Sequence, residues 1–173
     1  MPDIGYTTAG ATSADIQGVI TGTSGTTDGT GGAVASISAY ARYTSGSETV
    51  TACVYRESDS VKMGSDSGTS TAWSTSASWQ TITYSGPTLA ASTSYIATIA
   101  PTEGAVGQFQ LYYDTAGTNG FDHYYGDTRP LPDPAGWFNS NTSSKWSIYA
   151  TYSSGGGGPT KAVYTSLTGA GQF

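Results

Sequence analysis

The sequence predicts an all-β fold, an antiparallel sandwich or barrel, and three observations support this class. The chain of 173 residues contains 24 serines and 28 threonines but only 4 leucines, a composition that disfavours helices. Short runs of β-branched and aromatic residues recur between clusters of Gly, Ser, Asn and Pro, as in antiparallel sandwiches and barrels. Within several runs polar and apolar residues alternate, which is the period of a half-buried strand.

Nine strands are expected in chain order, each bounded by turn residues. They cover Ile16–Thr21, Ala33–Tyr43, Glu48–Arg56, Val61–Gly64, Trp79–Tyr84, Ser94–Ala100, Gln108–Tyr113, His123–Tyr125 and Trp146–Tyr152. Residues 21–32 are expected to form a low-complexity hairpin or loop. Its glycines Gly29, Gly31 and Gly32 are candidates for positive φ, which glycine adopts without steric cost.

Alternation also predicts the core, which is expected between two antiparallel sheets. The run Thr49–Tyr55 has apolar residues on both faces, so we expect a central strand that is covered on both sides. Its Cys53 is then inert packing, because a buried thiol lacks the electropositive, exposed setting of a reactive one. The expected core residues are Val50, Ala52, Val54, Ile82, Ile96 and Ile148.

Four consecutive glycines divide the chain into a domain and a tail. The expected division is a β-sandwich over residues 1–153, a Gly-rich linker over 154–158 and an extended C-terminal arm over 159–173. The run Lys161–Leu167 alternates as a strand does, and a short isolated strand needs a partner surface to stay ordered. We expect it to pair with a neighbouring subunit. Its expected contact residues are Val163, Tyr164, Leu167 and Phe173.

The charge balance disfavours two classes of partner. With 12 acidic and 6 basic residues the net charge is −6, and no Lys/Arg cluster is present to displace phosphate counterions. The sequence therefore predicts binding neither to nucleic acid nor to an anionic membrane surface. No apolar run is long enough to span a membrane, and no secretion signal is expected at the N-terminus. The single cysteine excludes an intrachain disulfide.

No motif for catalysis is complete. His123 is the only histidine, and an ordinary strand histidine is the favoured interpretation, because a general base needs partners whose placement the sequence does not show. Glycoside hydrolysis needs two carboxylates at a defined separation, and sequence spacing does not provide one. We therefore expect a protein that is not an enzyme. The carboxylates considered are Glu103, Asp114, Asp122 and Asp127.

No cofactor is expected, and calcium is the candidate ion. Turn carboxylates such as Asp28, or the nearby pair Glu57 and Asp59, provide the oxygen ligands that calcium prefers. Because no EF-hand spacing is present, solvated turn carboxylates are the favoured interpretation. A zinc site is disfavoured, since the chain has one Cys and one His far apart.

Aromatic residues concentrate between Gln108 and Phe138. Flanked by Asp, Asn and Arg, such rings can form a sugar-stacking platform or a protein interface. The residues expected to form this platform are Tyr113, Phe121, Tyr125, Trp137 and Phe138.

The succession AVASISAYARY, TACVYRESDSVKMG and PDPAGWFNSNTSSKWSIYATY resembles jelly-roll domains similar to carbohydrate-binding modules. Such domains are common among virion-associated proteins of phages and metagenomes. The resemblance covers about residues 4–152 and rests on Tyr55 at a strand end, Trp79 at a strand start, Leu89 leading to Tyr95, and the closing run Trp146–Tyr152. It implies a jelly-roll sandwich. Similar folds carry unrelated functions, so the resemblance fixes the fold better than the activity.

These observations together favour a virion structural protein, a phage capsid decoration or fibre-type subunit made in the host cytoplasm. Its expected partners are the major capsid protein or sister subunits in a homo-oligomer. The alternative is a carbohydrate-binding or receptor-binding domain that uses surface aromatics on glycans. A second alternative is a secreted adhesive surface domain, which would be extracellular.

Overall fold

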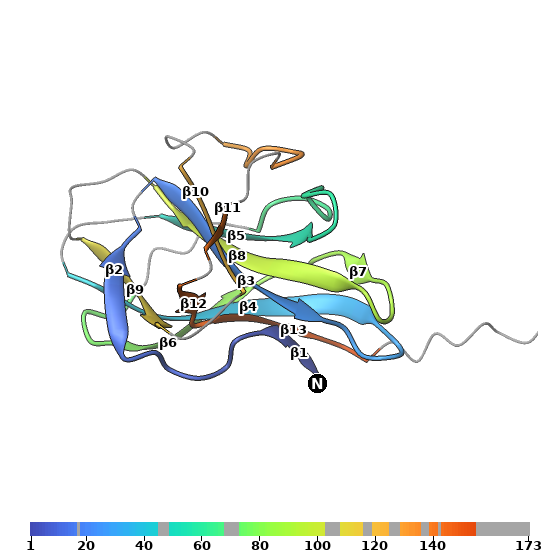
Figure 1. The fold of residues 1–173 in the computed structure, drawn as a ribbon, viewed down its shortest axis with the longest axis horizontal. Helices are drawn as coiled ribbons and strands as arrows, with labels where there is room; N and C mark the ends of the chain where they lie inside the picture. The colour runs from blue at the N-terminus through green and yellow to red at the C-terminus, as the bar shows by residue number, and fades with distance from the viewer. Residues whose placement is uncertain are drawn as a thin grey trace, which may run out of the picture.

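The computed structural model describes residues 1–16, 18–44, 49–67, 73–102, 108–115, 119–124, 129–135, 139–141 and 143–154. These residues form two antiparallel sheets packed on each other, and no helix occurs among them. Figure 1 shows the two layers, with β4 and β13 in the lower one and β3, β5 and β8 in the upper one. The predicted all-β sandwich is confirmed. The jelly-roll connectivity and the C-terminal arm stay predictions.

The larger sheet has eight strands. Its order is β1 (Asp3–Gly5), β13 (Ile148–Tyr152), β4 (Gly32–Tyr43), β9 (Phe109–Asp114) and β12 (Lys145–Trp146), with β2 (Thr12–Asp15) on β9, and β6 (Ser78–Thr83) and β7 (Thr88–Leu89) on β4. Strand β4 is the centre of this sheet, because it pairs with β6 on one side and with β13 and then β9 on the other.

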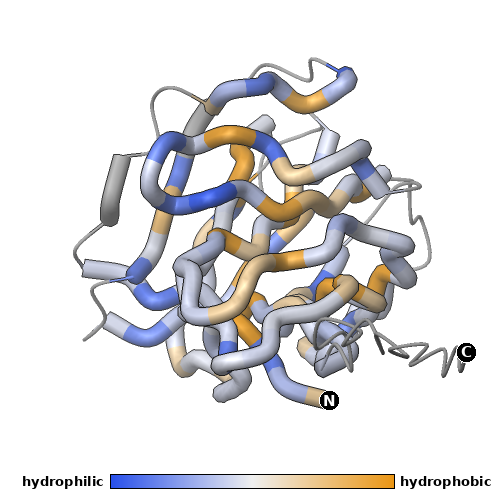
Figure 2. The backbone as a smooth tube through the Cα atoms, turned by 90° about the vertical axis from the view of Figure 1, so that its right-hand side faces the viewer, coloured by the Kyte–Doolittle hydropathy of each residue, from blue (hydrophilic) through white to orange (hydrophobic). Residues whose placement is uncertain are grey.

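The smaller sheet has five strands. Its order is β11 (Asn139–Asn141), β10 (Gly120–Tyr124), β3 (Val19–Thr26), β8 (Ser94–Pro101) and β5 (Val50–Arg56). Figure 2 shows short hydrophobic stretches alternating with weakly polar ones along the backbone. This is the pattern of strands that bury one face.

The main core lies between the sheets. Five of the six expected core residues belong to it: Val50, Ala52, Val54 and Ile148 are fully buried, and Ile82 is 5% exposed. The placement expected for the sixth residue is wrong, because Ile96 is buried in a second cluster with Cys53, Tyr55 and Leu131. In β8 the neighbours of Ile96, Tyr95 and Ala97, point into the main core. The pleat therefore turns Ile96 to the outer face of the smaller sheet.

Strand β5 is covered on both faces, as expected, but it is not a central strand. It ends the order of the smaller sheet. Its outer edge is closed by the following segment, because the Met63 and Ser67 amides donate to the Val54 and Ala52 carbonyls, both at 2.8 Å. The strand expected over Val61–Gly64 is reduced to one bridge, between Tyr55 and Lys62. An irregular segment of this kind protects a sheet edge from further pairing.

The loop expected over residues 21–32 is partly wrong, because β3 continues to Thr26. Close packing requires the two glycines of β3, Gly22 and Gly25. A Cβ on Gly22 would lie 2.7 Å from side-chain carbons of β8, and one on Gly25 would lie 2.6 Å from the Gly5 nitrogen. Within the shorter loop, Gly31 and Gly32 have positive φ as expected, at 64° and 149°. Gly29 does not appear among the positive-φ glycines.

Several strand boundaries differ from the expectation. The closing run is split into β12 and β13 at Ser147, whose hydroxyl accepts a hydrogen bond from the Gly10 amide at 2.8 Å. Strands β1, β2, β7 and β11 were not expected, because they are short and have few apolar residues.

In the described part of the chain, no helix is long and apolar enough to cross a membrane. Residues 155–173, which hold most of the expected linker and the whole arm, lie outside the described residues.

Candidate functional site

The residues expected to form a binding platform do not share one surface where the structure describes them. Tyr113 on β9 is half-buried, and its ring packs against Trp146 with the centroids 4.8 Å apart. Phe121 on β10 is 8% exposed and belongs to the second core cluster, so it offers no open ring face. Outside the described residues lie Tyr125, Trp137 and Phe138, together with the expected arm contacts Val163, Tyr164, Leu167 and Phe173.

A different set of aromatic side chains does share one surface, the outer face of the larger sheet. We call Tyr40, Trp79, Tyr112 and Tyr149 the aromatic face; they come from β4, β6, β9 and β13 and each is half-buried. Their rings touch in succession: the centroid distances are 5.0 Å from Tyr149 to Trp79, 5.6 Å from Trp79 to Tyr40, and 5.2 Å from Tyr40 to Tyr112. Tilted and edge-on pairs at this spacing are favourable aromatic geometries.

Strand pairing brings these four rings together. In β4 the residues Ala39 and Ala41 are buried in the core, so Tyr40 between them points outward. Tyr40 pairs with Trp79 across to β6. Ser38, two residues earlier on the same face, pairs with Tyr149 on β13. Because Ser38 is small, the rings on either side of β4 can meet above it, and Ser38 is left only 2% exposed.

Hydroxyl and amide groups surround the aromatic face. The Ser38 and Thr81 hydroxyls are hydrogen-bonded at 2.8 Å, and Ser36 lies in register between Thr83 on β6 and Thr151 on β13. Next to Tyr112 on β9, the Arg42 Nε donates to the Gln110 amide oxygen at 2.7 Å. The surface is therefore aromatic at its centre and rich in uncharged hydrogen-bonding groups around it. These side chains include Ser36, Ser38, Thr81, Thr83, Gln110 and Thr151.

A polar cluster lies beside this surface, on β9 and β12 and the segment that follows β1. The Tyr6 hydroxyl donates to the Asp114 carboxylate at 2.7 Å, and the Lys145 Nζ lies 4.2 Å from the Tyr6 ring centroid. The hydrogen bond from Tyr6 lowers the pKa of Asp114, helped by the Ala11 amide, and the same bond raises the pKa of Tyr6. Asp114 therefore stays ionised as a hydrogen-bond acceptor, which does not suit a general acid.

Asp28 and Asp59, two of the three turn carboxylates considered for calcium, have protein partners. Asp28 accepts hydrogen bonds from the Thr30 amide and hydroxyl and from the Gly31 amide at 2.8–2.9 Å, and these bonds lower its pKa. Asp59 is paired with Arg56 in an ion pair at 2.5 Å, and this partner lowers the Asp59 pKa. Within the described ranges, no group of three or more His, Cys, Asp or Glu side chains is arranged to hold a metal ion.

Of the remaining candidate catalytic residues, the structure describes the side chain of Asp122 but not those of His123, Glu103 and Asp127. The backbone of His123 pairs with Ile20 inside the smaller sheet, while its side chain is outside the description. Glu103 and Asp127 also lie outside the described residues. Asp122 is half-buried on β10, on the strand face opposite Phe121.

Asp122 lines a cleft between the two sheets. The cleft has a volume of about 380 Å³ and opens where β2 and β12 of the larger sheet face β3 and β10 of the smaller one. On β9 it is lined by Tyr113, whereas the aromatic face uses Tyr112. Successive strand residues point to opposite sides, so the two surfaces are separate. The lining consists of Ala14, Asp15, Ile16, Val19, Tyr113, Asp122, Ser144 and Trp146.

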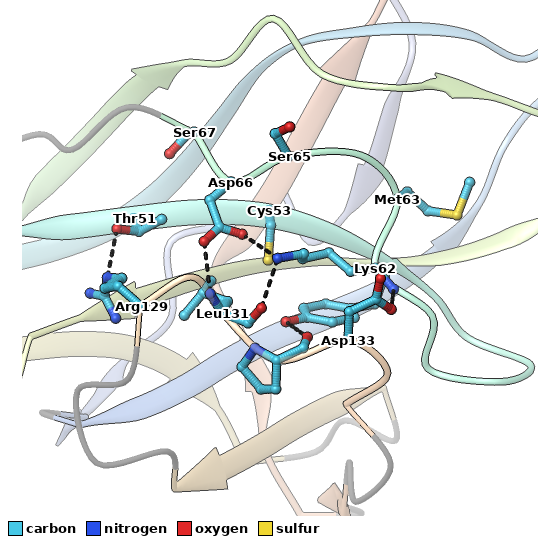
Figure 3. Close-up of polar contacts among 12 residues, drawn as sticks. Thr51, Cys53, Lys62, Met63, Ser65, Asp66, Ser67, Arg129, Leu131 and Asp133 are labelled. Carbon is cyan, nitrogen blue, oxygen red and sulfur yellow. Dashed lines mark hydrogen bonds and ion pairs between the residues drawn. The ribbon is translucent and has the colours of Figure 1, made fainter.

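Polar contacts hold the proline-rich segment 129–135 on the outer face of the smaller sheet (Figure 3). The Lys62 Nζ binds the Asp66 carboxylate at 2.9 Å and the Leu131 carbonyl at 2.7 Å, and Asp66 accepts from the Leu131 amide at 2.8 Å. The side chains of this ion pair are only 9% and 14% exposed. At the other end of the segment, Arg129 donates to the Thr51 hydroxyl at 3.1 Å.

This segment shields Cys53. The thiol is fully buried, and its Sγ lies 3.1 Å from the Thr98 hydroxyl oxygen. Burial raises the pKa of Cys53 to about 12. A thiol with so little thiolate at neutral pH is a poor nucleophile, in agreement with the expected packing role. The Lys62–Asp66 pair therefore fixes the segment that covers the second core cluster, in which Cys53 and Leu131 are buried.

Comparison with known proteins adds no family assignment, because no family model matches the chain and no curated protein matches it.

Proposed function

We propose that the protein is a non-enzymatic carbohydrate-binding domain that holds an uncharged polysaccharide on its aromatic face. The observation that carries the proposal is the run of four touching rings, Tyr149, Trp79, Tyr40 and Tyr112, on one side of a sheet. Such rings offer large amphipathic contact area at low conformational cost. The jelly-roll connectivity implied by the resemblance belongs to the same proposal.

The polar surroundings favour a sugar over an apolar ligand. A sugar ring has apolar C–H patches, which pack on aromatic faces, and hydroxyl groups at its rim, which need hydrogen-bond partners. The Ser36, Thr81, Thr83 and Thr151 side chains and the Gln110 amide supply such partners beside the rings. Burying a polar group without a partner costs free energy, so this hydroxyl-rich border suits a hydroxylated ligand.

The charge pattern favours an uncharged ligand. Arg42, the basic residue on β4, already donates to Gln110, and the whole chain has a net charge of −6. A negative protein repels anionic polymers at long range. Uronic-acid and sulfated polysaccharides are therefore disfavoured, whereas neutral glucans, xylans and mannans are not.

The test is affinity electrophoresis in gels that contain neutral polysaccharides, with Trp79→Ala and Tyr112→Ala as variants. The parent should be retarded by at least one neutral polysaccharide, and each variant should bind about ten-fold or more weakly, a loss of about 1.4 kcal/mol. Thr88→Ala is the matched control, because Thr88 is exposed on β7 of the same sheet and is not among the groups beside the rings. It should bind like the parent or slightly more weakly. Melting curves establish that all variants are folded.

The proposal fails if no neutral polysaccharide retards the parent, or if Trp79→Ala binds as the parent does. Self-association lost in Trp79→Ala, without any glycan binding, would instead make this face a protein interface. That outcome would favour the virion structural role expected from the sequence. The virion role and the adhesive role stay predictions, because the arm that would attach the protein lies outside the described residues.

A further inference from the structure

Two buried polar side chains lie at or next to the cleft between the sheets: Trp146 lines it, and Thr21 pairs with the lining residue Asp122. Thr21 on β3 is fully buried and Trp146 on β12 is 4% exposed, and within the described residues the Thr21 Oγ1 and the Trp146 Nε1 have no hydrogen-bond partner. A buried donor without an acceptor gives up its hydrogen bond to water and gains none in return, which is unfavourable. A bound polar molecule is one explanation for such groups, because it supplies the hydrogen-bond partners that they lack.

These groups lie around the carboxylate of Asp122. Thr21 is directly opposite Asp122 in the pairing of β3 with β10. Gly120 is two residues before Asp122 on the same strand face, and a Cβ there would lie 3.2 Å from the Trp146 Cδ1, the ring atom bonded to Nε1. The Thr21 hydroxyl and the Asp122 carboxylate therefore belong to facing residues of one strand pair, and the Trp146 indole lies against the next position of β10 on the same face.

Besides Asp122, two lining residues are polar, Asp15 and Ser144, and the other lining residues are apolar or aromatic. Ile16 and Val19 line one side, and Tyr113 and Trp146, whose ring centroids are 4.8 Å apart, line the other. None of the eight lining residues is basic. The volume of about 380 Å³ is within the size range of small-ligand sites.

This set of groups selects the ligand by its donors and acceptors. A carboxylate accepts hydrogen bonds, a hydroxyl does both, and an indole N–H only donates. A protonated amine would donate to Asp122 and Thr21 and would be attracted to the neighbouring ring faces. A hydroxyl oxygen on the same molecule would accept from the Trp146 Nε1. An anion would meet the Asp122 carboxylate and is excluded.

We propose that this cleft binds a small amino alcohol, with its ammonium group on Asp122 and its hydroxyl group on the Trp146 indole N–H. The proposal does not depend on glycan binding by the aromatic face, since the two surfaces lie on opposite sides of β9. The same chemistry, a protonated amine close to a hydroxyl, is found in free amino alcohols and in amino-sugar units. Both sources are tested below.

The test follows the indole N–H signals of ¹⁵N-labelled protein during titration with 3-amino-1-propanol. The Trp146 signal should shift and saturate at millimolar concentration, while the Trp79 signal on the aromatic face stays in place. Butylamine lacks the hydroxyl and 1,4-butanediol lacks the charge, so each should bind about ten-fold or more weakly. Saturation by glucosamine at a lower concentration than 3-amino-1-propanol would identify an amino-sugar unit as the source, and the reverse order would identify a free amino alcohol.

Variants test the role of the carboxylate. Asp122→Asn should weaken binding of 3-amino-1-propanol about ten-fold or more, whereas Asp3→Asn, an exposed carboxylate on β1, should bind like the parent. The probe series on the parent protein needs no variant, so it decides the matter even if Asp122→Asn does not fold. The proposal is overturned if 1,4-butanediol shifts the Trp146 signal as 3-amino-1-propanol does, if folded Asp122→Asn binds normally, or if no probe shifts the signal.

Discussion

Removing the charge of Asp66 should destabilise the protein strongly. Asp66→Asn keeps the size of the side chain and an oxygen for the Leu131 amide, but it takes away the partner of Lys62, whose side chain is only 9% exposed. Leaving one member of a buried ion pair uncompensated costs about 3–5 kcal/mol. For a chain of this length, each kcal/mol shifts the melting temperature by about 2–4 °C, so we expect a decrease of about 6–20 °C.

The assay is thermal and urea unfolding of the parent and the variants. Asp59→Asn is the matched control, because it breaks an ion pair whose side chains are 40% and 41% exposed. Exposed pairs contribute little, so its melting temperature should stay close to that of the parent. High salt should reduce the difference between the parent and Asp66→Asn only slightly, since buried pairs are weakly screened.

A double variant separates the charge from the contacts with the loop. Lys62→Met with Asp66→Leu removes both charges, and replacing a buried pair by apolar residues is often neutral. Here the recovery should be incomplete, because both side chains also hold the backbone of Leu131. If Asp66→Asn unfolds like Asp59→Asn, this pair does not hold segment 129–135 against the sheet and the reasoning is wrong.

Three further predictions concern the core. Gly22→Ala should lower the free energy of unfolding by about 1–3 kcal/mol through overpacking, because its Cβ would lie 2.7 Å from two side-chain carbons of β8. In the control Gly29→Ala the new Cβ meets no atom within 4 Å, so its melting temperature should equal or exceed that of the parent. Ile148→Ala should cost about 2–5 kcal/mol in urea unfolding through lost burial and a cavity, since Ile148 is fully buried; a parent-like midpoint would contradict its place in the core. Cys53 should resist a thiol reagent in the native protein from neutral pH to about pH 9, because burial raises its pKa to about 12, and should react at once in urea. Rapid labelling of the folded protein would show that segment 129–135 opens readily.

The local pattern of the sequence is enough to predict strands and their buried faces. In the run from Trp79 to Tyr84 alternation separates Trp79, Thr81 and Thr83 from Gln80, Ile82 and Tyr84. The structure buries Ile82 and Tyr84 and leaves Gln80 half-buried. Alternation also predicts that Thr49–Tyr55 is covered on both sides. Alternation does not predict the full length of β3, whose glycines serve close packing. Gly22 is required because a side chain there would collide with β8, about 70 residues later in the chain.

The candidate sites depend on contacts that no local pattern contains. Tyr40, Trp79, Tyr112 and Tyr149 lie on four different strands, and each is simply one member of an alternating pair in the sequence. Crowding of aromatic residues points to Gln108–Phe138, which contributes Tyr112 to the aromatic face but in which Phe121 is buried. A local signal exists for three members of the aromatic face: Tyr40, Tyr112 and Tyr149 each follow a small or apolar residue that is buried in the core. Those buried residues are Ala39, Leu111 and Ile148.

The sequence by itself determines that this chain forms an antiparallel all-β fold, because hydroxyl-rich alternation with few helix-forming residues leaves each strand one face to bury. It also identifies part of the main core, the five residues Val50, Ala52, Val54, Ile82 and Ile148. Only the tertiary structure decides which strands are neighbours, since pairing joins residues as far apart as Asp3 and Thr151. The aromatic face and the inter-sheet cleft arise from that pairing. Their rings and carboxylates become neighbours through the order and register of the strands, which periodicity along one strand does not specify.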